Sequence, residues 1–457
     1  MRLFKRHISA RSVTAFVAEN MLIFGSITVV ARLHGPVDAP GAALWKIGLV
    51  VALCQMSLYY NDFYNLTLIN SNRELVIRLL QATGAASIVL GVVYFALPSL
   101  DLGNGVFVTS LALVLVGVFT CRLLFNRLSR ARGLRERLLI VGTGPAAKII
   151  ARQILAQREF GYDIVGFIDR DASRIGESLV NPRIVGTPAD IGRLVESHDV
   201  ARIVVALPDR RGALPVQELI EAKLAGVRIE DAATTYERLT GKILLDDLRP
   251  SAVIFSDGFH VSPLTRFVKR VIDLLLALVG SILAAPLMVL TALAIRLESG
   301  APVLYSQVRV GENGSPFTLY KFRSMRLDAE NGTPVWARDG DDRVTGVGRI
   351  IRKTRIDELP QLWNVVKGEM SFVGPRPERP YFVEQLLAAV PFYAQRHAVK
   401  PGVTGWAQTK YRYGSSVEDA IEKLRYDLYY IKHMSILFDL TIVFDTVKVI
   451  LFRKGAK

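Results

Sequence analysis

The stretch RKTRIDELPQLWNVVKGEMSFVGPRPE, from Arg352 to Glu378, places two carboxylates side by side in a run otherwise crowded with cations. Thr354 fits the N-cap of a helix, and the spacing T-x-x-D then puts Asp357 at the third helical position. Acidic side chains in a first turn complement the helix dipole. A purely structural role can therefore explain Asp357 and Glu358 at this point.

Two features of the stretch indicate chemistry as well. Neighbouring helical residues project about 100° apart, so one cap cannot use both carboxylates. Arg352 and Arg355 precede the pair, and Arg376 follows it in the turn VGPRPE. Carboxylates among guanidinium groups can bind Mg²⁺ or attack phosphorus, while arginines bind phosphate oxygens bidentately. An aspartate nucleophile is an established form of covalent catalysis, so the residues alone leave both interpretations open.

The composition indicates a membrane protein that meets anions. The chain has 457 residues, 51% of them hydrophobic, and 57 basic against 42 acidic side chains give a net charge of +15. This balance suggests an anionic partner, which could be nucleic acid, anionic lipid or a phosphorylated substrate, and the hydropathy favours lipid. Cys54 and Cys121 both lie in apolar runs, so we expect no disulfide framework and no thiol nucleophile.

The first quarter of the chain contains four apolar segments of about the length that a spanning helix needs. They cover roughly 13–33, 43–61, 78–99 and 105–125. Cations precede the first segment and follow the fourth, so both ends are expected to face the cytoplasm. We predict a four-helix transmembrane bundle over 1–130, with a soluble helical bundle as the alternative.

From residue 138 the pattern changes to alternating strands and helices. LLIV (138–141) is typical of a buried strand, and further strands are expected at YDIVGFID (162–169), RIVVALP (202–208) and VRIED (227–231). This series predicts a parallel α/β domain over 131–250. GTGPAA, with Gly142 and Gly144, follows the first strand and could hold a nucleotide phosphate at a helix N-terminus. Asp169 is the best candidate for its acidic partner. A Rossmann-like scaffold without a ligand explains the same small residues.

A fifth apolar run covers 271–295 and has cations on both sides, which is awkward for a simple span. Pro286 lies in the middle of this run, where it removes a helical hydrogen bond and favours a kink. We predict a re-entrant helix over about 266–297 that returns to the same face of the membrane. An ordinary spanning helix is the alternative. The last apolar stretch, 435–452, is interrupted by charges and suits the membrane interface.

The segment QVRVGENGSPFTLYKFRSM (307–325) has Gly311 and Gly314 where a hairpin turn is expected. Lys321 and Arg323 follow on the second strand. They are candidates for binding substrate phosphates, although two alternating cations fit a solvated strand face equally well.

From about residue 264 to 457 the chain resembles the bacterial sugar transferases of the monotopic phosphoglycosyl transferase superfamily. The resemblance is carried by KRVIDLLLA, YKFRSM, the opening stretch with its flanks, and KPGVTGWAQ. With the N-terminal spans, the whole chain resembles the long form, the exopolysaccharide polyprenyl glycosylphosphotransferases. The resemblance implies a catalytic domain over 258–457 and a CoA-binding-like character for the Rossmann-like domain.

The resemblance also implies a reaction at the cytoplasmic face of the bacterial inner membrane. A UDP-sugar donates its sugar 1-phosphate to polyprenyl (undecaprenyl) phosphate, which gives polyprenyl-diphosphate-sugar and UMP. Asp357 would be the nucleophile of a ping-pong mechanism, and Glu358 with Asp357 would bind Mg²⁺. Arg352 and Arg376 would contact phosphates. We expect a homodimer and no nucleic-acid partner.

Two other functions compete with this one. A dinucleotide-dependent sugar-modifying enzyme would use GTGPAA, but YERLT (236–240) has Thr240 where a Tyr-x-x-x-Lys pair requires lysine. A membrane-bound nucleotide-sensing regulatory or scaffolding protein of polysaccharide export would have an inactive C-terminal domain. The intact Asp357–Glu358 pair is evidence against that second alternative.

Overall fold

The computed structural model describes residues 10–33, 40–61, 63, 72–100, 106–130, 135–156, 161–207, 214–245, 259, 261–327, 329, 341–411 and 416–452. The chain forms two compact units, Met1–Thr235 and Tyr236–Lys457. The first contains the N-terminal helices and a parallel sheet, and the second contains the acidic pair.

Four helices form over the four apolar segments, because each segment is long, apolar and free of interior proline. They are α1 (Ala10–Leu33), α2 (Pro40–Tyr60), α3 (Asn72–Ala96) and α4 (Val106–Arg130), and the short η1 (Pro98–Leu100) follows α3. Their buried side chains form one apolar core that includes Ile23, Ile47, Leu79 and Val118. By length and composition α1 and α3 could cross a membrane, whereas the apolar parts of α2 and α4 are shorter. The transmembrane bundle itself stays a prediction.

The parallel α/β domain is confirmed. Its five strands are all parallel in the order β3-β2-β1-β4-β5. The strands are β1 (Glu136–Val141), β2 (Tyr162–Ile168), β3 (Ile184–Gly186), β4 (Arg202–Val205) and β5 (Arg228–Asp231). The sequence pattern missed β3, because three residues are too few to show an alternation.

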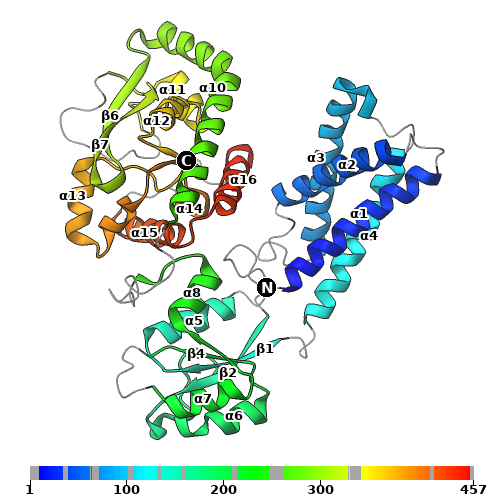
Figure 1. Ribbon diagram of the computed structural model, residues 1–457, viewed down its shortest axis with the longest axis vertical. Helices are drawn as coiled ribbons and strands as arrows, with labels where there is room; N and C mark the ends of the chain where they lie inside the picture. Colours follow the sequence, from blue (N-terminus) through cyan, green and yellow to red (C-terminus); the bar gives the residue numbers. More distant parts are fainter. Residues whose placement is uncertain are drawn as a thin grey trace. The chain divides into compact units, whose positions relative to one another are not determined.

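Helices cover both faces of this sheet, as Figure 1 shows, with α6 and α7 on one face and α5 on the other. The helical elements are α5 (Pro145–Ala156), η4 (Ala172–Arg174), η5 (Pro188–Asp190), α6 (Ile191–His198), α7 (Val216–Leu224) and α8 (Ala232–Thr240). Leu139 and Val141 of β1 pack with Leu194 of α6 and Leu219 of α7. Burial of apolar strand faces under these helices holds the layers together.

The second unit begins with a long helix and a hairpin. These are α10 (Pro263–Ser299), β6 (Leu304–Val310), η7 (Glu312–Gly314) and β7 (Pro316–Phe322). The antiparallel pairing of β6 with β7 confirms the hairpin turn predicted at Gly311–Gly314. Hydrogen bonds from Gly311 N to Ser315 O and from Ser315 N to Glu312 O close the turn.

Short elements then build the rest of this unit around one core. They are α11 (Gly346–Lys353), η8 (Ile356–Glu358), α12 (Gln361–Lys367), β8 (Ser371–Val373), α13 (Pro380–Ala389), η9 (Tyr393–Ala398), β9 (Gly402–Thr404), α14 (Trp406–Lys410), α15 (Val417–Lys432) and α16 (Ile436–Phe452). Trp406, Tyr430, Phe438 and Ile442 are buried at its centre. Trp406 also donates its indole N–H to the Gly241 carbonyl at 2.9 Å, so the segment after α8 is part of this unit.

Helix α10 is held by the same unit at both of its ends. Near its start Lys269 donates to the Val373 carbonyl, in its first half Ala277 packs against α12, and near its end Ile295 packs against Phe322 and Ile351. Between these contacts Ile282 and Leu283 are largely exposed. The helix continues through the exposed Pro286, and Figure 1 shows that its path bends rather than running straight. The bend agrees with the expected effect of proline, while the re-entrant course in a membrane stays a prediction.

Candidate active site

The acidic pair lies on a single 3-10 turn, so the prediction that Thr354 is its N-cap is wrong. Thr354 instead ends α11, and its Oγ1 donates to the Ile350 carbonyl at 2.9 Å. Arg355 then adopts the left-handed conformation with φ 59°, which turns the chain into η8. A hydroxyl bonded back to the preceding turn cannot also cap the next one. The pair is therefore presented on a short connection between α11 and α12.

Glu358 is enclosed by three cations. Its Oε1 accepts from Arg376 Nη2 at 2.8 Å, from Lys321 Nζ at 3.3 Å and from Arg355 Nη1 at 3.3 Å. Burial by itself raises the pKa of Glu358, but Arg376, Lys321 and Arg355 outweigh it and hold that pKa well below the ordinary value. Glu358 is thus a permanent anion that fixes the positions of the cations around it.

Asp357, in contrast to Glu358, has a raised pKa and a carboxylate oxygen without a hydrogen-bond donor among the described residues. Its Oδ1 is buried and has no hydrogen-bond partner within the part of the chain that the structure describes. Burial first, and the Glu358 carboxylate second, raise the pKa of Asp357. A buried carboxylate oxygen without a donor is uncommon, because it loses its hydration without compensation. Such an oxygen is available to an incoming group.

The two cations have different roles, although Lys321 lies on β7 and Arg323 directly follows that strand. Lys321 reaches Glu358, and burial lowers the pKa of Lys321 while Glu358 opposes that effect. Arg323 donates from Nη2 to the Ser299 carbonyl at 2.8 Å and to the Gly300 carbonyl at 2.9 Å, at the end of α10. Both residues have little exposed surface, so the alternative of a solvated strand face is wrong for this pair. Phosphate binding by Arg323 stays a prediction.

The two arginines that flank the pair are also placed differently. Arg376 contacts Glu358 directly and reaches Gln408 at 3.3 Å. Arg352 lies in the last turn of α11, and its buried Nη1 has no hydrogen-bond partner among the described residues. An orphan guanidinium N–H is a donor that a substrate oxygen could satisfy. Arg355, which the sequence places three residues before Glu358 among the surrounding arginines, is brought against that carboxylate.

A buried ion pair behind the site supports Arg376. Arg396 of η9 donates from Nη2 to Asp427 Oδ2 and to the Arg376 carbonyl, each at 2.9 Å. Its Nη1 donates to the Tyr393 hydroxyl at 2.5 Å. Arg396 and Asp427 are 5% and 2% exposed, so water competes little for these bonds. The pair fixes the backbone from which the Arg376 side chain extends.

The carboxylate pair fits the way in which proteins usually hold Mg²⁺. The described residues contain no cluster of three or more His, Cys, Asp or Glu side chains suited to a metal. Mg²⁺ needs no such cluster, because it commonly keeps several waters and uses one or two carboxylates together with substrate phosphates. The unpartnered Oδ1 of Asp357 is an oxygen of the required type.

The Gly142–Gly144 turn follows β1 at the point where the sheet order reverses between β1 and β4. Gly142 has φ 114°, and a Cβ there would lie 2.5 Å from the Ala206 carbonyl, so close packing requires glycine. Asp169 accepts from Thr143 Oγ1 and from Arg174 Nη1, each at 2.6 Å. The best candidate for a ribose-binding carboxylate is therefore already engaged, and nucleotide binding at this turn stays a prediction.

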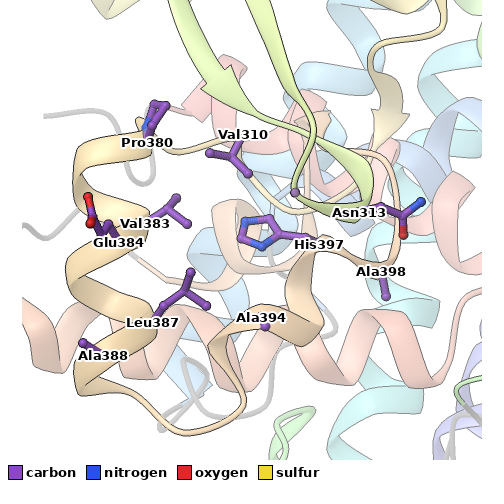
Figure 2. Close-up of a pocket in the computed structure, with 11 residues that line it drawn as sticks. Val310, Asn313, Pro380, Val383, Glu384, Leu387, Ala388, Ala394, His397 and Ala398 are labelled. Atoms are coloured by element: carbon purple, nitrogen blue, oxygen red, sulfur yellow. The ribbon is translucent and has the colours of Figure 1, made fainter.

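A cavity of about 890 Å³, to which no sequence motif points, lies beside the turn that contains Arg376. Its walls come from the tip of the β6–β7 hairpin, from α13 and from η9, and we call it the α13–η9 pocket. Figure 2 shows the His397 ring directed into this space between Val383 and Asn313. Burial, and secondarily Arg396, lower the pKa of His397 to about 4, so the ring is neutral at physiological pH.

A long, largely exposed apolar helix beside a buried acidic pair with surrounding cations defines a membrane-associated enzyme that acts on anionic groups. The family model described as "Bacterial sugar transferase" matches residues 264–453, and one described as "CoA-binding domain" matches 60–222. The chain is 31% identical over 352 residues to the UDP-glucose:undecaprenyl-phosphate glucose-1-phosphate transferase of Escherichia coli (strain K12). That alignment covers 74% of this chain and 73% of that protein. The chain belongs to the bacterial sugar transferase family, which confirms the resemblance.

Other relatives share the lipid acceptor in their names but differ in the sugar. The UDP-N-acetylgalactosamine-undecaprenyl-phosphate N-acetylgalactosaminephosphotransferase of Aeromonas hydrophila is 44% identical over 239 residues, or 52% of this chain and 56% of that protein. The undecaprenyl-phosphate galactose phosphotransferase of Salmonella typhimurium is 30% identical over 369 residues, or 77% of this chain and 75% of that protein. Among solved structures, a Rex-family repressor matches 39% of this chain at 16% identity with a TM-score of 0.21, too low a likeness to indicate a shared fold.

Proposed function

We propose that this protein transfers a sugar 1-phosphate from a UDP-sugar to polyprenyl phosphate, giving polyprenyl-diphosphate-sugar and UMP. The relatives named above carry undecaprenyl phosphate in their names, and two of the three also name a UDP-sugar. The reaction would start the assembly of an exopolysaccharide or a related glycan. Because the relatives differ in the sugar, the sugar itself is left to experiment.

One observation carries the proposal: two adjacent carboxylates have opposite environments. Glu358 is bound by three cations, whereas the Oδ1 of Asp357 has no partner among the described residues. A nucleophile needs a free electron pair, and a structural anion needs its charge compensated. Asp357 meets the first requirement and Glu358 the second, so only Asp357 is suited to attack.

The transfer proceeds in two displacements at one phosphorus atom. Oδ1 of Asp357 attacks the sugar-bearing phosphorus, the bridging P–O bond breaks, and UMP leaves with the bridging oxygen. A phosphate oxygen of the lipid then attacks the aspartyl phosphate, and the bond to Asp357 breaks and restores the carboxylate. Lys321, Arg355 and Arg376 supply positive charge that stabilises the negative charge of the transferred phosphoryl group. Each step conserves atoms and charge without an oxidant or reductant.

Asp357 and Glu358 are the residues that would hold Mg²⁺ in this site. A bound divalent cation polarises phosphoryl oxygens and offsets the charge of a diphosphate. The fit rests on the donor set, since the Asp357 carboxylate has a second oxygen besides the attacking Oδ1 and the adjacent Glu358 supplies a second carboxylate.

Helix α10 supports the membrane part of the proposal. Lys269 and Arg270, near its start, bond to the carbonyls of Val373 and Val365. Arg323 bonds to its end. A helix with both ends tied to one soluble unit enters and leaves the membrane on one side, as a re-entrant course requires. We place this unit at the cytoplasmic face of the inner membrane in a multi-pass protein, and we propose a homodimer.

The test is UMP release by the full-length protein in detergent or lipid, with polyprenyl phosphate and a panel of UDP-sugars. We expect one or two sugars to give UMP. The substitution Asp357→Asn should reduce the rate at least about 1,000-fold, because removal of a nucleophile removes the covalent route. The matched control is Asp163→Asn, which changes an exposed aspartate of β2 in the other unit.

Undiminished UMP release by the Asp357→Asn protein would overturn the assignment of the nucleophile. Absence of UMP release with every UDP-sugar, from a protein that unfolds cooperatively, would instead overturn the reaction. Incubation with a labelled UDP-sugar in the absence of lipid should leave a labelled protein, since the first displacement does not need the acceptor.

A further inference from the structure

The geometry points to the α13–η9 pocket as the subsite that holds the nucleoside of the donor. This inference rests on the proposed function, which requires a nucleoside diphosphate but does not say where the base lies. No contact described above assigns a role to the pocket. Its volume of about 890 Å³ falls in the range of small-molecule sites.

The pocket and the acidic pair are separated by only a short stretch of chain. Arg376 bonds to Glu358, and two residues further on the Glu378 carbonyl accepts from the N–H of Val310, which lines the pocket, at 3.0 Å. Two extended residues span at most about 7 Å. A molecule with its phosphates near Arg376 can therefore place its other end in the pocket.

A cation also lies on this path. Arg309 donates to the Pro377 carbonyl at 3.0 Å and lies 3.6 Å from Glu378. Arg309 and Arg376 thus flank the turn that separates the acidic pair from the pocket. These two guanidinium groups are suited to bind the diphosphate that joins a nucleoside to a sugar.

The lining matches a planar base with a polar edge. Val310, Val383 and Leu387 give the pocket apolar walls, and the side chains of His397 and Asn313 offer both donors and acceptors. Figure 2 shows the His397 ring among these residues. A neutral imidazole can bond a base edge without the desolvation of a charge. Apolar walls with a few placed polar groups are typical of such subsites.

The same lining argues against the acyl chain of the lipid as occupant. The lining residues come from the hairpin tip, α13 and η9, and none comes from the apolar helices α10 or α16. A lipid tail would enter from the apolar surface of α10, where Ile282 and Leu283 are exposed. We therefore assign the pocket to the nucleoside.

Photolabelling tests the location without requiring turnover. The full-length protein is irradiated with UDP that carries an azide on the uracil ring, with and without excess unlabelled UDP, and the labelled peptides are mapped. We expect labelling within 380–398 that unlabelled UDP prevents. Labelling confined to the first unit, or labelling of 380–398 by a photoreactive polyprenyl phosphate instead, would overturn the proposal.

Kinetics provide the second test. His397→Ala should raise KM for the UDP-sugar about tenfold, as expected for one lost hydrogen bond to a bound ligand, and leave KM for polyprenyl phosphate unchanged. His198→Ala, in an exposed last turn of α6, is the matched control. Leu387→Phe, at a half-exposed position, narrows the pocket and should act in the same direction if His397→Ala does not fold.

The two proposals fail separately. A protein that binds and is labelled by the uridine probe but releases no UMP would contradict the reaction and not the pocket. A protein that releases UMP normally, with His397→Ala and Leu387→Phe both unchanged in KM for the UDP-sugar, would contradict the pocket and not the reaction.

Discussion

Two neighbouring side chains of the same chemical class differ here only in what surrounds them. Oε1 of Glu358 accepts from three cations, while Oδ1 of Asp357 accepts from none among the described residues. Burial is similar, since each is 8% exposed. The difference in their pKa directions therefore comes from the placement of Lys321, Arg355 and Arg376 and not from depth.

The raised pKa of Asp357 predicts how the stability of the folded protein changes with pH. The pKa of Asp357 is raised in the folded protein, first by burial and then by Glu358. The folded state then binds the proton more tightly than the unfolded state, so stability falls as pH rises from the ordinary carboxyl pKa through the raised value. Asp357→Asn cannot ionise and should be more stable than the native protein at pH 7, with the gain lost near pH 4.

Thermal unfolding of the purified protein at both pH values measures this effect. Asp163→Asn, at an exposed strand position, should show no such pH-dependent gain. A native protein that is more stable than Asp357→Asn at pH 7 would show that the Asp357 carboxylate has a stabilising partner. An inactive variant with higher stability would mark Asp357 as a residue kept for chemistry rather than for folding.

The residue scale also shows what a sequence can and cannot predict. Asp357, Glu358 and Arg376 were selected from charge and spacing, and the structure brings Glu358 and Arg376 together. Lys321 and Arg323 are two residues apart in the sequence, but β7 ends between them, and tertiary partners decide that Lys321 reaches Glu358 and Arg323 the end of α10. His397 was missed because its significance depends on a cavity that three separate segments enclose.

At the scale of elements, the error at Thr354 has a simple cause. The pattern T-x-x-D was real, but α11 had already used Thr354 to end its own last turn. The strand pattern was more reliable, because β1, β2 and β4 are largely buried and β5, although more exposed, is long enough to show it. Local patterns predict elements well and junctions between them less well.

The pairing of η9 with α15 gives a prediction at this scale. Arg396 holds both Asp427 and the Arg376 carbonyl. Arg396→Met leaves the buried Asp427 without its partner and should reduce stability by about 3–5 kcal/mol. The double variant Arg396→Met with Asp427→Leu removes both charges, so it should recover most of that stability. Its rate should stay low, because the Arg376 backbone has lost its anchor.

Denaturant unfolding and UMP release separate these effects. A purely structural role for Arg396 requires the double variant to recover activity together with stability. A positioning role requires recovery of stability alone. Arg396→Lys keeps the charge but not the forked geometry, and it should give an intermediate rate.

At the scale of the whole molecule, composition and hydropathy predict a membrane protein, the alternation of strands and helices predicts a parallel α/β domain, and the resemblance of the C-terminal motifs implies a transferase domain. The sheet order and the family membership confirm the last two. The side of the membrane on which each part lies depends on the charges that flank the apolar segments, and cysteine labelling can test it.

The topology prediction is that residues 138–260 and 300–434 lie on the same side of the membrane. Cysteines introduced at Asp163 and Glu418, in a chain with Cys54→Ala and Cys121→Ala, should react equally with an impermeant reagent in inverted vesicles. A cysteine at Asn104, in the cation-free DLGNG connection, is expected to react only from the opposite side. Reaction of Asp163→Cys and Glu418→Cys from opposite sides would rule out a re-entrant α10.

The end of α10 and the acidic pair are joined by a very short piece of chain. Arg323, the first residue after β7, bonds to the end of α10, and Lys321, the second-to-last residue of β7, bonds to Glu358. On the re-entrant course proposed for α10, a strain that the bilayer places on this helix would reach Glu358 through three residues. We therefore predict that the rate of UMP release changes with the acyl-chain length of the surrounding lipid.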